Sequence, residues 1–203
     1  SPEDVRNFEE WKRGQGLSLQ QIFSKIYDEG HWGQSEDPRS RFFSGPGSHD
    51  VAILSAYVSA IQTFAAELGA PVSALDLGCG DFNIGSRIRP SFSDYTACDI
   101  VPQLIEANRS LYADHAVDFR CLDFTREQIP RADVVFVRQA LQHLSNLDVA
   151  AFVRGISGRC KYLVITEHLP QGSDFVPNLN KPSGGDIRLG IGSGVVLTAA
   201  PFN

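Results

Sequence analysis

The chain has 203 residues, a length that suits one domain with an extended terminus. It carries 18 Lys and Arg against 24 Asp and Glu, and the net charge of −6 argues against a protein that binds nucleic acid by neutralising phosphates. No apolar run approaches ~20 residues and no signal peptide is visible, so we expect a cytoplasmic protein without a membrane partner. The four cysteines show no Cys-x-x-Cys spacing, which predicts buried, reduced thiols and no metal site.

Residues 1–50 are predicted to form a helical cover outside the sheet, and residues 51–203 the main domain. A short helix is expected from Val5 to Trp11, and Ser18 is a plausible N-cap for a second helix from Leu19 to about Glu29. The segment that follows is rich in Gly, Ser and aromatic residues. Loops of this composition are lids or rigid covers.

The main domain opens with an amphipathic helix from Val51 to Leu68, which Gly69 and Pro71 end. Its predicted buried face holds Ile53, Leu54, Tyr57, Ile61, Phe64 and Leu68. Apolar runs then predict parallel strands at 74–77, 95–100, 117–124, 132–137 and 161–168, with helices at 83–89, 102–112 and 148–155 between them. A long loop through residue 190 and a sixth strand at 194–198 are expected to follow.

The turn after the first strand is the centre of the chain. Asp76 lies at the end of this strand, and Gly78 and Gly80 follow it. A strand-to-helix turn leaves backbone N–H groups free, and glycines without Cβ let a ligand approach the backbone. A ligand that carries both an ammonium and a carboxylate fits this turn.

Two further acids follow strands of the same predicted sheet. Asp99 ends the second strand, 23 residues after Asp76, where an acid of a doubly wound sheet reaches ribose hydroxyls. Asp123 follows the third strand and is either a ligand-binding acid or a cap for residues 125–128. Asp99 favours an adenosine-containing ligand without choosing its kind.

The turn resembles motif I of the class I S-adenosylmethionine-dependent methyltransferases, an acid followed by three alternating glycines, although Phe82 stands where the third glycine belongs. The order Ile26-Tyr27, Trp32-Gly33 and 44–48 (SGPGS) resembles the N-terminal region of a bacterial subgroup of these enzymes. The resemblance implies a Rossmann-like α/β sandwich with a mostly parallel sheet, S-adenosylmethionine as cofactor and S-adenosylhomocysteine as product. It implies cofactor-binding roles for Asp76, Gly78, Gly80, Asp99, Ile100, Asp123, Phe124 and Arg138, and lets Arg41 or Ser48 reach the cofactor's carboxylate.

Three other interpretations stay open. A nicotinamide-dependent oxidoreductase would need Gly-x-Gly-x-x-Gly, and Gly85 comes two residues too late for that pattern. A non-catalytic cofactor-binding subunit would explain Phe82 and the absence of the family's last strand. A glycine turn that binds no ligand is the third.

The catalytic candidates are His143, His168 and Asp186, with Glu167 beside them, because the predicted topology places them all at the carboxyl ends of strands four to six. A hydroxyl acceptor would need one of them as general base. Asp186 and Arg188 could hold a polar acceptor such as a sugar, or form a surface ion pair of small value. The segment after strand four lacks the Asn/Asp-Pro-Pro-aromatic motif of base N-methyltransferases. We therefore expect methylation of a small molecule at oxygen, with a sugar as first guess; a homodimer stays open.

Overall fold

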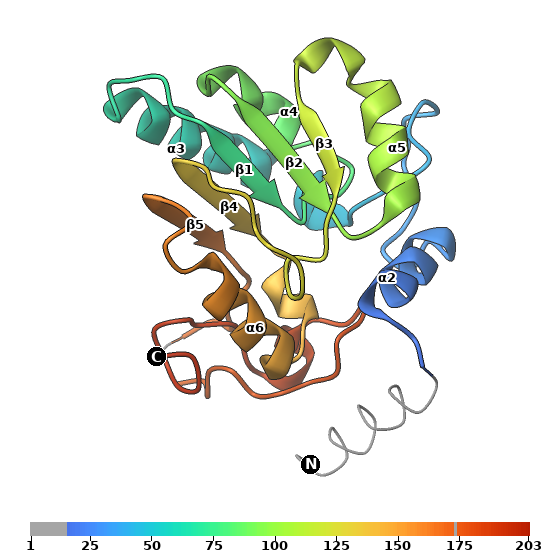
Figure 1. Cartoon of the computed structure of the whole chain (residues 1–203). Coiled ribbons are helices and arrows are strands. Elements are labelled where there is room, and N and C mark those ends of the chain that lie inside the picture. The colour runs from blue at the N-terminus through green and yellow to red at the C-terminus, as the bar shows by residue number, and fades with distance from the viewer. Residues whose placement is uncertain (1–15, 173) are drawn as a thin grey trace.

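The computed structural model describes residues 16–172 and 174–203 (Figure 1). The expected helix from Val5 to Trp11 lies outside the described residues. Five strands form one parallel sheet in the order β3-β2-β1-β4-β5. Their bounds are β1 Ala74–Leu77, β2 Tyr95–Asp99, β3 Asp118–Cys121, β4 Val134–Arg138 and β5 Tyr162–Thr166. The strand order reverses between β1 and β4, so the predicted Rossmann-like α/β fold is confirmed.

Alternating side chains of the strands divide the core into two layers. On β1, Leu75 and Leu77 pack on one face of the sheet and Ala74 on the other. The first layer also takes residues of α2 (Leu19–Asp28) and α6 (Asn146–Ile156), and the second those of α3 (Val51–Glu67) and α4 (Gly85–Ile88). Helix α5 spans Pro102–Leu111, and the short 3-10 turns are η1 Pro46–Ser48, η2 Arg89–Ser91, η3 Ala113–His115, η4 Leu141–His143 and η5 Arg188–Ile191.

Capping residues explain where the helices begin. Ser18 and Gln21 form a reciprocal capping box at α2, as the sequence predicts. The Asp50 carboxylate accepts hydrogen bonds from the backbone N–H groups of Ala52 and Ile53 and so starts α3. Ser145 caps α6, which begins two residues before the predicted start at Asp148.

Four local predictions were wrong. Residues 194–198 form no strand, and the helix expected at 83–89 shortens to α4, which η2 with Pro90 follows directly. Ile53 is 47% exposed, and the buried side of α3 is Leu54, Ile61 and Ala65. Of the four cysteines only Cys98 is fully buried, whereas Cys121 is exposed.

Within the described residues, no helix has the length and apolar character that would let it cross a membrane. The same part of the chain contains no cluster of His, Cys, Asp or Glu that could hold a metal ion.

Candidate active site at the carboxyl ends of the strands

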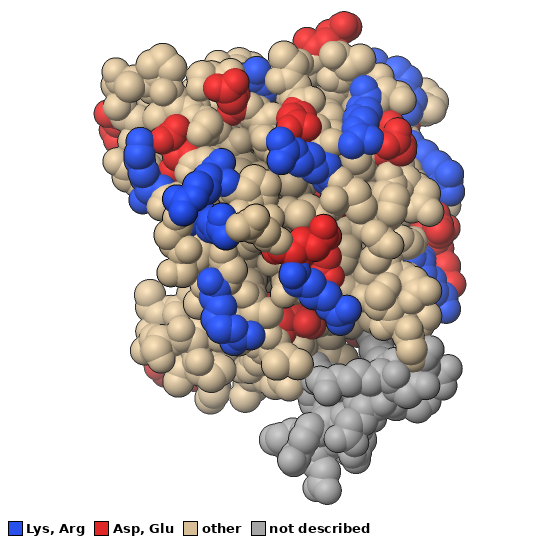
Figure 2. All heavy atoms as spheres, in the orientation of Figure 1, with Lys and Arg blue, Asp and Glu red and all other residues tan. Residues whose placement is uncertain are grey.

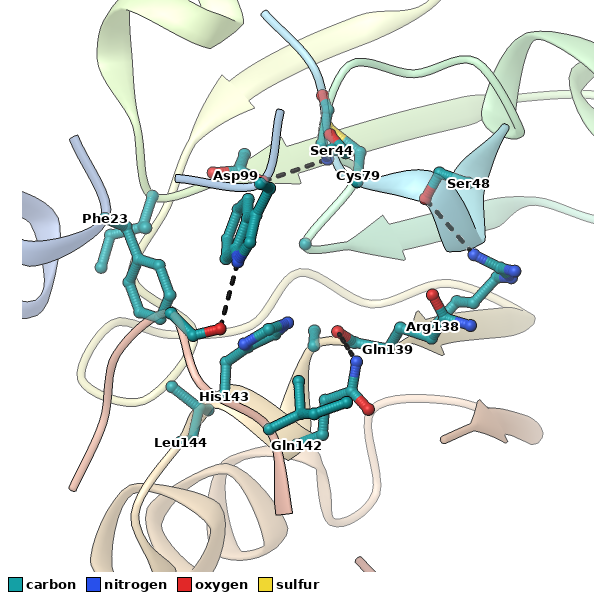
Figure 3. Close-up of a pocket in the computed structure, with 18 of the residues that line it drawn as sticks. Phe23, Ser44, Ser48, Cys79, Asp99, Arg138, Gln139, Gln142, His143 and Leu144 are labelled. Atoms are coloured by element: carbon teal, nitrogen blue, oxygen red, sulfur yellow. Dashed lines mark hydrogen bonds between the residues drawn. The ribbon is translucent and has the colours of Figure 1, made fainter. Parts of the chain in front are cut away.

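A cavity of about 420 Å³ lies where the strands of the sheet end (Figure 3). Four segments line it: the cover residues of α2 and 44–48, the turns after β1, β2 and β3, the segment 138–144, and the loop residues His168 and 185–187. This volume is typical of a small-molecule site. All three catalytic candidates and seven of the eight predicted cofactor-binding residues line it; Asp76 is the exception.

The glycine turn is packed tightly by the protein itself. Gly78 and Gly80 both have positive φ angles, 75° and 57°, which favour glycine. A Cβ on Gly78 would lie 2.9 Å from the Cβ of Ala140, and a Cβ on Gly80 would collide with the hydroxyl of Ser44. The two positions therefore require glycine because the cover and the segment after β4 pack directly against the turn.

Phe82 replaces the third glycine of the motif without disturbing the turn. It adopts a left-handed conformation with φ 61°, which costs about 1 kcal/mol or more for a residue with Cβ. Its fully buried ring packs edge-on against Tyr95 and Phe119, which offsets that cost. The ring occupies the space where any side chain on Gly85 would lie, so the displaced glycine makes room for the phenylalanine.

Asp99 is the buried acid at the end of β2 (Figure 3). Its carboxylate accepts hydrogen bonds from the backbone N–H groups of Gly80 and Val101, both at 3.1 Å. Burial raises the pKa of Asp99 to about 6, although these backbone hydrogen bonds oppose the rise. The side chain thus connects the ends of β1 and β2 and lines the cavity as the sequence predicts.

Asp123 is a capping residue, as one of its two predicted roles requires, and its ligand-binding role stays a prediction. One carboxylate oxygen accepts hydrogen bonds from the backbone N–H and the hydroxyl of Thr125, at 3.0 and 2.6 Å, and so caps the turn. The residue nevertheless lines the cavity, together with Ile100 and Phe124. Its other oxygen lies 3.8 Å from Nε of Arg126.

Asp76 and Arg138 line a second, smaller cavity of about 30 Å³, which shares the wall of Ser48, Gly78, Cys79 and Arg138 with the larger one. The Asp76 carboxylate accepts a hydrogen bond from the Tyr95 hydroxyl at 3.1 Å, and burial raises its pKa to about 7. Arg138 donates to the carbonyl oxygen of Gly47 at 2.8 Å, while its buried Nε has no partner. Burial lowers the pKa of this arginine.

Aromatic residues fasten the cover over the cavity. The Tyr27 hydroxyl and the Ser44 hydroxyl are hydrogen-bonded at 2.9 Å, and the Trp32 indole N–H donates to the carbonyl oxygen of Gly185 at 3.1 Å. Trp32 therefore joins the cover to the loop after β5. Arg41 was predicted as a cofactor contact, but it points away to Asp28 at 3.2 Å and does not line the cavity. Ser48 does line it.

His168 forms the polar wall of the cavity together with two glutamines. Its Nδ1 lies 3.1 Å from Oε1 of Gln142, and its Nε2 lies 3.1 Å from Nε2 of Gln139. Desolvation, with the positive charge of Arg138 as a second cause, lowers the pKa of His168. Neither glutamine was predicted as a site residue, and the only available signal was their position directly after β4, where this fold binds ligands.

His143 is buried in the cavity wall at the end of η4 (Figure 3). Its ring lies 4.9 Å from that of Trp32, and its buried Nδ1 has no hydrogen-bond partner. Burial, with the charge of Lys181 as a second cause, lowers the pKa of His143 to about 4. The imidazole is therefore neutral near pH 7.

Asp186 and Arg188 do not act together. Asp186 is exposed at the edge of the cavity, whereas Arg188 is 1% exposed and donates to the carbonyl oxygen of Leu141 at 3.0 Å and to Oδ1 of Asn146 at 2.8 Å. Both predicted roles of Arg188, in acceptor binding and in a surface ion pair, were wrong. Glu167 is also structural, since its carboxylate accepts from the N–H groups of Leu141 and Gln142.

Comparison with known proteins agrees with this geometry. The profile of a family described as "methyltransferase domain" matches residues 75–161, from the second residue of β1 to the residue before β5. No curated protein matches the chain significantly.

Three solved structures illustrate the similarity of fold. Magnesium protoporphyrin IX methyltransferase from Synechocystis PCC 6803, with bound S-adenosylmethionine, has a TM-score of 0.57 at 12% identity, covering 76% of this chain and 78% of that one. An S-adenosylmethionine-dependent methyltransferase from Clostridium acetobutylicum ATCC 824 scores 0.53 at 16% identity, covering 73% and 56%. Human N-acetylserotonin methyltransferase scores 0.53 at 20% identity, covering 78% and 46%.

The matched family segment contains the glycine turn, Asp99, Asp123 and Arg138, and the surrounding fold has the predicted strand order. Residues 75–161 therefore match a methyltransferase domain, and the chain has the fold of S-adenosylmethionine-dependent methyltransferases.

Proposed function

We propose that this enzyme transfers the methyl group of S-adenosylmethionine to a hydroxyl oxygen of a small molecule. One observation carries the oxygen assignment: the cavity wall contains an imidazole, His168, which two glutamine side chains orient and whose Nε2 can accept a proton. An oxygen acceptor must lose a proton during transfer, and a positioned imidazole is the commonest group to take it.

The cavity lining suits S-adenosylmethionine. Asp99 would accept from the ribose hydroxyls and Asp123 from the adenine amino group, with Ile100 and Phe124 against the ring. Arg138 would hold the carboxylate, since its buried Nε has no partner in the protein. The domain boundary at residue 50 remains part of this proposal, with the segment before it covering the cofactor.

S-adenosylmethionine supplies an electrophilic methyl group on a sulfonium, and the chain has to position the acceptor and exclude water. The aromatic cover residues Tyr27 and Trp32 close the cavity from the side of α2. His168 would take the proton of the acceptor hydroxyl at Nε2. His143 has its unpartnered Nδ1 in the same wall, and Asp186 lies at the edge, where it can contact a polar part of the acceptor.

Two observations support a small acceptor over a macromolecular one. The cavity lies between the cover and the loop after β5, which Trp32 and Gly185 join. Figure 2 shows basic and acidic side chains interspersed on the visible face, without the single-sign surface that nucleic acid binding requires. The names of magnesium protoporphyrin IX methyltransferase and N-acetylserotonin methyltransferase also give small-molecule acceptors. An oxidoreductase is not favoured, because the glycine spacing and the matched family both disagree with it.

The test uses S-adenosylmethionine labelled with ¹³C in its methyl group and pooled hydroxylated small molecules. We expect S-adenosylhomocysteine to form and the label to appear as a methyl ether. The His168→Ala variant should lose at least ten-fold in turnover while its affinity for S-adenosylmethionine, measured by calorimetry, stays within two-fold. A label found only on nitrogen would overturn the oxygen assignment, and a loss of cofactor affinity would remove His168 from the acceptor side.

A further inference from the structure

The hydrogen bonds around His168 determine which of its nitrogens carries the proton. The Gln142 side-chain N–H donates to the backbone carbonyl oxygen of Gln139 at 3.3 Å, which leaves its Oε1 facing Nδ1 of His168. Nδ1 therefore carries the proton and donates it to Gln142. The lone pair is on Nε2, where it accepts a hydrogen bond from the Gln139 amide.

The Gln139 amide is the hydrogen-bond partner of His168 that an acceptor molecule can replace. Gln139 has a left-handed backbone with φ 52°, and its side chain lies between His168 and Gly47 of the cover, where its Oε1 would be 2.6 Å from a Cβ on that glycine. An acceptor hydroxyl at Nε2 of His168 would take the place of this amide N–H. The exchange replaces one donor by another at the same lone pair.

No carboxylate of the described chain stabilises a charge on His168. The partner of its Nδ1 is a neutral amide, and the adjacent carboxylate of Glu167 is directed at backbone N–H groups of η4. The charge that acts on its pKa is the positive one of Arg138, which lowers it in the same direction as burial. His168 is consequently a weak base, since imidazolium is stabilised by an adjacent carboxylate and destabilised by a cation.

A weak base restricts the acceptor to hydroxyls that ionise readily. A phenol such as the tyrosine side chain has a pKa of about 10, and an ordinary imidazole about 6.5. An aliphatic alcohol is roughly as weak an acid as water, at about 16. The proton of a phenol is therefore about six pKa units easier to transfer to His168.

Apart from the polar wall of His168 and the two glutamines, part of the cavity lining beyond the cofactor-binding acids is apolar and aromatic. Phe23, Trp32, Leu144 and Ile187 form this part. The Trp32 N–H is already bonded to Gly185, so the remainder of its indole presents apolar surface. With Asp99, Asp123 and Arg138 occupied by the cofactor, Asp186 at the edge is the one other formally charged residue of the lining.

Resting on the proposed O-methylation, we infer that the acceptor is an uncharged aromatic molecule with a phenol-type hydroxyl, that Gln142 is the positioning residue for His168, and that Gln139 occupies the hydroxyl's place in the free enzyme. In the transfer the phenol oxygen forms a bond to the methyl carbon with one of its own electron pairs. The carbon–sulfur bond breaks and its electron pair stays on sulfur. The hydroxyl proton moves to Nε2 of His168 and is then released to water.

The direct test compares 2-naphthol with its saturated counterpart, decahydro-2-naphthol, as acceptors for the unmodified enzyme. We expect S-adenosylhomocysteine to form at least 100-fold faster with 2-naphthol. Equal or faster transfer to the saturated alcohol would overturn the phenol assignment and leave O-methylation intact. Transfer to 2-naphthylamine but to neither alcohol would instead overturn the proposed function.

Two variants of Gln142 test the positioning role. Gln142→Glu places a carboxylate behind Nδ1, so the acid limb of the kcat/KM profile for 2-naphthol should move to higher pH, and the preference over the saturated alcohol should narrow about ten-fold. Gln142→Leu should lower kcat about ten-fold and change the affinity for S-adenosylmethionine less than two-fold. An unmoved pH profile with Gln142→Glu, in a folded protein, would reject the hydrogen-bonded relay.

Discussion

Ser44 and Asp81 hold each other by two reciprocal hydrogen bonds. The Ser44 backbone N–H donates to the Asp81 carboxylate at 2.9 Å, and the Asp81 backbone N–H donates to the Ser44 hydroxyl oxygen at 2.7 Å. The same carboxylate oxygen contacts Nε2 of His49 at 2.7 Å. Through this pair the cover is attached to the glycine turn on which the cofactor site is built.

Ser44→Ala should weaken both the fold and the site. It removes the acceptor of the Asp81 N–H and the partner of the Tyr27 hydroxyl, so we expect the free energy of unfolding to fall by roughly 1–3 kcal/mol. The dissociation constant for S-adenosylmethionine should rise at least three-fold. Urea denaturation and calorimetry measure the two effects. Ser93→Ala, at an exposed serine whose hydroxyl donates to its neighbour Asp94, is the matched control and should change neither.

Asp99→Ala should weaken S-adenosylmethionine binding ten-fold or more, because a buried hydrogen bond to a charged group is worth ~1.5–3 kcal/mol. Calorimetry on the folded variant measures the change. Asp118→Ala removes an exposed carboxylate of β3 that pairs with Arg120 outside the cavity, and it should leave the affinity unaltered. Unchanged binding in Asp99→Ala would remove this residue from the cofactor site.

Asp76→Asn should reduce the pH dependence of stability. The folded-state pKa of Asp76 is raised to about 7 by burial, so the folded protein binds an extra proton between pH ~4 and ~7. The stabilisation from this proton is complete below the unfolded-state pKa and is lost as the pH rises through about 7.

Asparagine does not titrate, and its Oδ1 can still accept from Tyr95. Urea denaturation measures how far the free energy of unfolding falls between pH 5 and pH 8. This fall should be smaller in Asp76→Asn than in the unmodified chain, by on the order of 2 kcal/mol. Asp94→Asn, at an exposed position, should behave like the unmodified protein. If the free energy of unfolding fell equally between pH 5 and pH 8 in the unmodified chain and in both variants, Asp76 would not titrate in this range.

Gly85→Ala should destabilise the fold through Phe82. The new methyl group would collide with the phenylalanine ring, and overpacking of this kind costs about 1–3 kcal/mol. The cost should shrink in a Phe82→Leu background, and a double-mutant cycle by urea denaturation measures that coupling. Gly190→Ala is the matched control, because open space surrounds Gly190. If Gly85→Ala lowered the free energy of unfolding by the same amount in the Phe82→Leu background, the idea that Gly85 makes room for the Phe82 ring would be contradicted.

Local patterns along the chain were sufficient to locate most elements and most of the cavity. Capping residues, the apolar strand runs and the glycine turn depend on neighbours within a few positions, and all five strands lie where these patterns predict. The strand at 194–198 failed because its apolar run has the composition of a strand, whereas pairing is decided by distant segments. In the structure Asn178 bonds to the carbonyl oxygens of Val196 and Ala200 and fixes that segment as a turn.

The sequence by itself determined the fold class, the cofactor through the family resemblance, and the position of the acids at the ends of β2 and β3. These acids could be placed because in a parallel sheet the strand ends meet at one edge whatever the rest of the chain does. Only the tertiary structure decided the roles of side chains that depend on distant partners. It buried Arg188, turned Asp76 to Tyr95, and brought Gln139 and Gln142 to His168 across 29 and 26 residues of chain. These contacts join segments that are far apart in the sequence, and no local sequence pattern indicates them. The roles of these side chains therefore depend on how the segments pack.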